Sequence, residues 1–227
     1  MKTYLSILLV LISVSLLAQD SVEQNIGDFS ELKVYDLIYV NLIPSTENKV
    51  LLTGEDKDEI SLVNKDGTLK IRMKTTKPFS GSANAVVVYY KDLAVIDANE
   101  GVTITSDQVL ERESLELRVQ EGGEIKLTLA VTQLISKAVT GGKLWLQGTA
   151  TSQDLSINTG GISNGKDLKT ETTSVTIKAG GEADINASQL AKIDIKAGGS
   201  VYVYGNPKEI DKKKLFGGRI KVIKEAP

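Results

Sequence analysis

Pairs of adjacent glycines recur through the second half of this 227-residue chain at a nearly constant spacing. Six pairs follow one another at intervals of 19, 19, 20, 18 and 19 residues, and Gly101 stands 21 residues before the first of them. A fixed period near twenty residues indicates a repeat architecture, whose units bury their apolar side chains only by stacking on one another. The glycines assigned to the seven expected corners are Gly101, Gly122, Gly123, Gly141, Gly142, Gly160, Gly161, Gly180, Gly181, Gly198, Gly199, Gly217 and Gly218.

Apolar residues keep a constant distance from these corners. Five positions before the first glycine stand Ile96, Leu117, Ser136, Leu155, Val175 and Ile193, and three positions before it stand Ala98, Val119, Ala138, Ile157, Ile177 and Ile195. After most pairs the alternation of apolar and polar residues resumes, which is the period of a β-strand. Each repeat is therefore predicted to hold at least two short strands that meet at a glycine corner. The corner needs glycine either for a positive φ or for close backbone approach.

Stacked repeats of this kind form an all-β, parallel β-solenoid. Seven coils at about 4.8 Å each would give a rod about 30–35 Å long. A sandwich of hairpins with Gly-Gly turns is the alternative, but a sandwich does not require repetition in register. In the last coil the inward positions hold Lys212 and Lys214, which we interpret as an end cap that deters edge-to-edge pairing. A basic docking patch is the other interpretation of these lysines.

Residues 19–90 precede the repeat, which occupies residues 91–227. Five segments read as strands, and residues 64–67 (Asn-Lys-Asp-Gly) are a hairpin signal. No low-complexity linker separates the two parts, so we expect the N-terminal β-rich segment to cover one end of the solenoid. The predicted strands span residues 29–35, 38–43, 49–53, 68–73 and 85–90.

Residues 1–18 are predicted to be a secretory signal peptide. One lysine precedes a thirteen-residue apolar run that ends near Ala18, and this run is shorter than the roughly 18–20 residues needed to span a membrane. The chain is therefore expected to be exported to the periplasm, the cell surface or the medium, with no transmembrane segment once the signal is removed.

At several points the chain resembles the secreted bacterial family known as putative auto-transporter adhesins, head GIN domain. The resemblance implies a right-handed β-solenoid related to the pectin-lyase fold, secretion and a role in cell adhesion. It offers no catalytic residues to carry over. The matching segments are residues 29–34, 39–42, 50–55, 66–71, 197–207 and 217–220.

The composition excludes several kinds of catalytic and metal-binding site, because the chain has no histidine and no cysteine. It has no cysteine-built metal site, no Ser-His-Asp relay and no thiolate nucleophile. A formal charge of −2 argues against nucleic-acid binding. The carboxylates of the repeat region occupy different positions within their repeats. We interpret them as side chains that point outward and keep the surface soluble. We therefore predict no catalytic residue, no metal and no cofactor; the carboxylates considered are Asp154, Asp167, Asp184 and Asp194.

Trp145, Tyr202 and Tyr204 are the candidate binding residues. Outward aromatic side chains on nearby coils would form a strip suited to sugars or protein. Ordinary surface packing is the alternative interpretation. The expected function is non-enzymatic adhesion or binding, with a surface glycan or an extracellular protein as partner. The alternatives are a carbohydrate-active β-helix enzyme and a self-assembling envelope scaffold.

Overall fold

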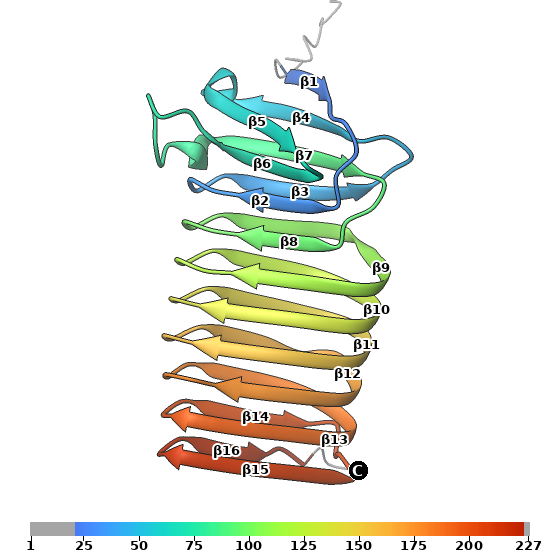
Figure 1. Cartoon of the computed structure of the whole chain (residues 1–227), viewed down its shortest axis with the longest axis vertical. Coiled ribbons are helices and arrows are strands. Elements are labelled where there is room, and N and C mark those ends of the chain that lie inside the picture. Colours follow the sequence, from blue (N-terminus) through green and yellow to red (C-terminus); the bar gives the residue numbers. More distant parts are fainter. Residues whose placement is uncertain (1–20, 225–227) are drawn as a thin grey trace, which may run out of the picture.

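The computed structural model describes residues 21–224, which form a rod of stacked strands (Figure 1). The predicted signal peptide lies outside the described residues. Two 3₁₀ helices, η1 (Lys57–Glu59) and η2 (Gly81–Ala83), are the helical elements of this range. The strands before the repeat are β1 (Ser21–Asn25), β2 (Glu31–Val34), β3 (Tyr39–Pro44), β4 (Lys49–Gly54), β5 (Ile60–Lys65), β6 (Thr68–Met73) and β7 (Asn84–Tyr90). Those of the repeat are β8 (Val95–Ala98), β9 (Thr103–Val119), β10 (Glu124–Val139), β11 (Lys143–Asn158), β12 (Ile162–Ile177), β13 (Glu182–Ala197), β14 (Ser200–Tyr204), β15 (Glu209–Phe216) and β16 (Arg219–Val222).

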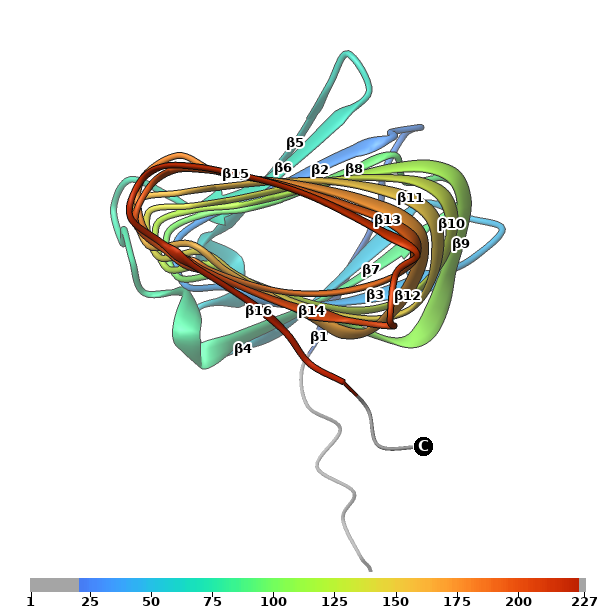
Figure 2. The ribbon, with the colours of Figure 1, turned by 90° about the horizontal axis from the view of Figure 1, so that it is seen from below.

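Each strand from β9 to β13 runs from one glycine corner to the next and bends once on the way. Its first half, together with β3, β7, β14 and β16, forms the leading face of the rod. Its second half, together with β2, β6, β8 and β15, forms the trailing face. Seen from below, the chain runs counter-clockwise as it approaches the viewer (Figure 2), so the solenoid is right-handed. The fold is a β-solenoid of about seven turns, as predicted.

The apolar ladders are in the predicted register. Leu155 pairs with Val175 and Val175 with Ile193, while Ile157 pairs with Ile177 and Ile177 with Ile195. All of these side chains are buried. The repeat strands pair in parallel, which excludes the hairpin sandwich. Parallel strands in register place like side chains above one another, so the core is a continuous stack along the rod axis.

The two glycines of a corner have different tasks. Thr140 and Gly141 both have positive φ (48° and 73°), the conformation of a tight type I′ turn. A Cβ on Gly141 would meet nothing within 4 Å. A Cβ on Gly142 would stand 2.4 Å from the carbonyl oxygen of Val119 in the preceding coil. The first glycine therefore supplies the turn, and the second allows successive coils to approach.

The N-terminal strands extend the stack in an order that differs from the chain. The coil formed by β2 and β3 lies between the β6–β7 coil and the β8–β9 coil, both of which come later in the sequence. Strand β2 pairs in parallel with both β6 and β8, and β3 pairs in parallel with both β7 and β9. Beyond them, β4 and then β1 add antiparallel strands to the leading face, and β5 forms the predicted hairpin with β6. The N-terminal segment thus covers one end of the solenoid, as expected (Figure 1).

The corner of the β2–β3 coil contains no glycine. Asp36 and Leu37 adopt positive φ (65° and 64°), which is uncommon for residues with a Cβ. The buried carboxylate of Asp36 accepts hydrogen bonds from the backbone N–H groups of Met73 and Phe79, both at 3.1 Å. These bonds tie the corner to the coil above and hold it in its strained conformation.

At the other end, β15 and β16 form an incomplete last coil. Lys212 and Lys214 are in register with the buried Ile193 and Ile195 but are exposed, because no further coil within residues 21–224 covers them. The lysines therefore stand at the end of the apolar stack, the position predicted for them.

Candidate functional site

Two irregularities in the coils frame a groove on the leading face. Between β9 and β10 the register shifts at Ser106–Gln108, where β9 has two extra residues. Between β12 and its neighbours the register shifts at Gly165–Leu168. Bulges of this kind bend the strand and redirect its side chains. Strands β10 and β11 are regular relative to each other and form the floor between the two bulges.

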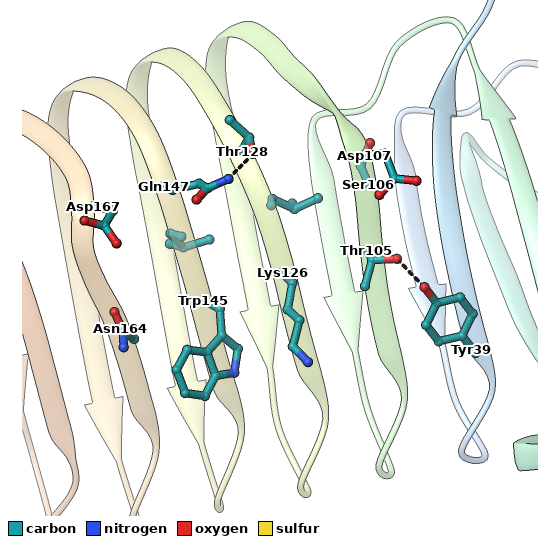
Figure 3. Close-up of a pocket in the computed structure, with 12 residues that line it drawn as sticks. Tyr39, Thr105, Ser106, Asp107, Lys126, Thr128, Trp145, Gln147, Asn164 and Asp167 are labelled. Atoms are coloured by element: carbon teal, nitrogen blue, oxygen red, sulfur yellow. Dashed lines mark hydrogen bonds between the residues drawn. The ribbon is translucent and has the colours of Figure 1, made fainter.

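The groove has a volume of about 520 Å³ and crosses five neighbouring strands, β3 and β9 to β12 (Figure 3). The exposed rings of Tyr39 (43%) and Trp145 (40%) provide its apolar surface. Hydrogen bonds hold two side chains in place: Tyr39 OH with Thr105 Oγ1 at 2.8 Å, and Gln147 Nε2 to Thr128 Oγ1 at 2.7 Å. The full lining is Tyr39, Thr105, Ser106, Asp107, Lys126, Leu127, Thr128, Trp145, Leu146, Gln147, Asn164 and Asp167.

The three aromatic residues singled out from the sequence lie on the leading face. Trp145 and Tyr202 occupy one outward row, with Asn164 and Asp184 between them on consecutive strands. Three strand spacings separate the two rings, about 14 Å. Only Trp145 lines the groove. Tyr202 lies farther along the same row, while Tyr204 is two residues on, outside the groove.

Tyr204 contacts the bulge of β12. The ammonium of Lys166 lies 5.5 Å from the centre of the Tyr204 ring, and Asn186 Nδ2 donates to the carbonyl oxygen of Lys166 at 2.7 Å. These contacts hold the bulge in shape. Burial, with a smaller contribution from Asp184, raises the pKa of the Tyr204 phenol. Tyr204 therefore supports one wall of the groove from outside it.

Asp167 projects from the same bulge and borders two hollows. It lines the groove and also a second hollow of about 800 Å³ on the other side of the bulge, toward the bend of the coils. The extra residue that creates the bulge is visible in the sequence as the 20-residue interval between Gly160 and Gly180. The 21-residue interval after Gly101 marks the other bulge in the same way. Departures from the nineteen-residue period were thus the signal for this site.

The four carboxylates considered from the sequence divide between the two faces. Asp167 and Asp184 are on the leading face, whereas Asp154 and Asp194 are on the trailing face. Burial and the neighbouring Glu182 raise the pKa of Asp184. Within residues 21–224, no group of three or more acidic side chains is arranged to hold a metal ion.

An ion-pair cluster occupies the trailing face near the N-terminal end. Glu116 accepts bonds from Arg118 at 2.9 Å and Lys137 at 2.8 Å, and Arg118 also reaches Glu31 at 3.2 Å. Asp97 is buried beside this cluster, and burial raises the pKa of its carboxyl group. The cluster lies on the face opposite the groove, and its charges are satisfied by one another.

The Glu116 pairs make the stability depend on pH. Hydrogen bonds from Arg118 and Lys137 lower the pKa of Glu116 from 4.5 to about 2. This contribution to stability is present above pH 4.5 and is lost as the pH falls toward 2. We expect Glu116→Gln to lose on the order of 2 kcal/mol at pH 7 and to lose less further stability on acidification. Urea unfolding at pH 7 and pH 3 measures both.

Glu124→Gln is the matched control, because in the described part of the chain Glu124 pairs only with Lys126 and that lysine is exposed. An exposed pair contributes less than about 1 kcal/mol. Identical acid sensitivity in the wild-type and Glu116→Gln proteins would contradict this account of the cluster.

Comparison with known proteins places the chain in a family. A family model described as "Putative auto-transporter adhesin, head GIN domain" matches residues 28–207, which is most of the sequence. The chain belongs to this family. The resemblance recognised from the sequence motifs is therefore confirmed. A search of the curated proteins finds no match.

Solved structures show the same fold. A putative adhesin from Bacteroides fragilis aligns with a TM-score of 0.83 at 18% identity, covering 90% of this chain and 96% of that one. A putative lipid binding protein from Parabacteroides distasonis aligns with a TM-score of 0.69 at 17% identity, with the same coverage of both chains. A putative adhesin from Parabacteroides merdae gives 0.63 at 16%, again covering 90% of this chain and 96% of that one. In the part of the chain described by the structure, no helix has the length and hydrophobicity to span a membrane.

Proposed function

We propose that this protein is a non-enzymatic adhesin that holds an extended carbohydrate chain in the groove of the leading face. Family membership supports an adhesive or binding role. The observation that carries the ligand class is the groove itself, an open trough across five strands with exposed aromatic rings and polar groups along it. A shallow trough suits a polymer that makes several contacts better than it suits one enclosed small molecule.

The lining offers both kinds of contact that a sugar chain needs. The rings of Trp145 and Tyr39 present flat apolar surfaces to the C–H faces of sugar rings. Asn164, Gln147 and Asp167 present amide and carboxylate groups that bond to hydroxyls. Tyr202 lies on the Trp145 row, so we propose it as a further stacking position for a chain that extends beyond the groove.

We also infer that residues 1–18 direct export, so that the groove meets its ligand outside the cytoplasm. The composition and length of the apolar run support this inference. Detection of the cleaved chain in periplasmic, surface and medium fractions would identify the compartment.

The test is a screen of glycans and matrix proteins with residues 19–227, followed by calorimetry on the best ligand. We expect Trp145→Ala to weaken binding about tenfold or more, because it removes the central stacking surface. Ile135→Ala is the control: Ile135 is equally exposed (41%) but lies on the trailing face. Equal binding by both variants would contradict the proposal.

The same experiment separates binding from catalysis. Asp107 and Asp167 both line the groove, and two carboxylates are what a glycoside-cleaving enzyme requires. We expect the bound glycan to be recovered intact after long incubation. Shortened products that disappear in Asp167→Asn would instead make the protein a carbohydrate-active enzyme.

A further inference from the structure

The C-terminal end of the rod is an uncovered surface of unusual composition. Residues 207–224, called the terminal coil below, include β15 and β16, which pair on one side with β13 and β14 and have no strand on the other within the described residues. Lys212 and Lys214 lie at the end of the apolar stack, in the two positions that Ile193 and Ile195 occupy in the preceding coil. This surface faces along the rod axis, at the bottom of Figure 1.

The terminal coil is strongly basic. It contains seven basic and two acidic side chains, a net charge of +5. All seven basic residues are exposed, and none forms an ion pair among the residues that the structure describes. The rest of the described chain has the opposite sign, since residues 21–206 contain 25 acidic and 19 basic side chains, a net charge of −6. The rod therefore carries a charge separation along its axis that orients the terminal coil toward an anionic surface.

Apolar side chains are exposed on the same strand as the lysines. Phe216 is 72% exposed and Leu215 is 61% exposed, the largest exposed fractions of any large apolar side chain in residues 21–224. Lysines alone would attract any polyanion. Lysines beside an exposed aromatic and an exposed leucine form the pattern by which proteins bind the interface of an anionic bilayer, where the rings and aliphatic groups enter below the headgroups.

We propose that the terminal coil attaches the rod, end first, to the surface of a bilayer that contains anionic phospholipids. Lys212, Lys213 and Lys214 bind the headgroups, while Leu215 and Phe216 enter the interface. The rod then stands away from the membrane. Trp145 lies four strands above β16, about 19 Å from the attached end, so the groove stays accessible.

The test is co-sedimentation of residues 19–227 with vesicles. This segment includes every described residue and omits the apolar run of residues 5–17, which would itself enter lipid. Vesicles of phosphatidylcholine with phosphatidylglycerol are compared with phosphatidylcholine alone. We expect binding only to the anionic vesicles, and its loss in about 1 M salt, where the screening length is about 3 Å.

Two variants separate the contributions of the lysine charges and of the apolar side chains to vesicle binding. Replacement of Lys212, Lys213 and Lys214 by Gln is expected to weaken vesicle binding on the order of a hundredfold, about fivefold for each charge. Leu215→Ser with Phe216→Ser should weaken it about tenfold or more. The control replaces three exposed, unpaired lysines elsewhere, Lys65, Lys70 and Lys143, by Gln, which changes the net charge equally. This control should bind like wild type, and thermal unfolding verifies that all variants fold.

Two outcomes would overturn the proposal. One is equal loss of binding in the terminal-coil and control variants, which would reduce the effect to net charge. The other is salt-sensitive self-association without vesicles that depends on Lys212–Lys214 while vesicles are not bound. That result would assign the terminal coil to an acidic surface of a second copy. Neither outcome bears on glycan binding, which is measured without lipid.

Discussion

Replacing Ile177 by aspartate is expected to prevent folding at neutral pH. The Ile177 side chain is fully buried between Ile157 and Ile195 in adjacent coils. A carboxylate there would have no polar partner and no water, and an unpaired buried charge costs on the order of 5 kcal/mol or more. That is comparable to the whole stability of an ordinary domain. Circular dichroism and urea unfolding of the purified variant measure the loss.

Lys178→Asp is the control for this substitution. Lys178 is the next residue along the chain and is exposed, so the same carboxylate stays in water and should change the stability by about 0.5 kcal/mol or less. A folded Ile177→Asp protein with an unchanged melting temperature would show that the inward ladder is wrongly assigned.

Replacing Gly142 by alanine is expected to cost about 2–4 kcal/mol. The added Cβ would stand 2.4 Å from the Val119 carbonyl oxygen and 2.6 Å from its carbon. Backbone atoms cannot rotate away as the end of a side chain can, so two coils must separate locally. That separation strains the bond from the Lys143 N–H to the Gly123 carbonyl oxygen (2.9 Å), which joins the same two coils.

Gly141→Ala separates the cost of a clash between coils from the cost of a positive φ. A Cβ at Gly141 points into open space, so only the positive φ is penalised, at about 1 kcal/mol. We expect urea midpoints to fall much further for Gly142→Ala than for Gly141→Ala. The reverse order would mean that turn conformation, rather than contact between coils, is the reason for the paired glycines.

The repeat could be predicted because its physics is local and periodic. One rule, that the residues three and five positions before a glycine corner face inward, identifies two buried positions in every coil from Ile96 to Ile195. In a solenoid that rule also fixes the long-range pairing, since each residue lies above its equivalent in the next coil. Ser136 fits the same ladder, although its side chain is polar and buried without a hydrogen-bond partner.

The N-terminal coils could not be placed from the sequence. Their strands were recognised, except β1 and β5, but their order in space depends on pairings between distant segments. The corner of β2–β3 also lacks the glycine signal, because Asp36 and Leu37 accept a positive φ there with the help of hydrogen bonds from Met73 and Phe79. Such help comes from tertiary structure and leaves no local pattern.

The sequence predicts only part of the groove. Outward aromatic side chains on nearby coils indicate a binding strip, and of the three candidates only Trp145 lines the groove. The sequence predicts a strand around Tyr39 but no role for this residue, because nothing local shows that β3 lies beside β9. The sequence predicts only a solubilising role for Asp167, because its position on a bulge follows only from the interval of 20 residues in which it occurs.

The position of the β2–β3 coil has a consequence for how the molecule is assembled and shortened. This coil is the first to be synthesised, yet both coils that flank it come later: β6 and β7 are complete at residue 90, and the parts of β8 and β9 that pair with it are complete at residue 105. Folding that starts at the N-terminus must therefore wait for later segments, whereas folding that starts within β10–β13 spreads by contacts between neighbours in sequence. Deletion of residues 21–44 would remove an interior layer together with β1, so that β6 and β8 lose their shared partner β2, and β7 and β9 lose their shared partner β3. Deletion of one whole coil near the C-terminus would remove only an outer layer, so the rod has one end at which its length is adjustable.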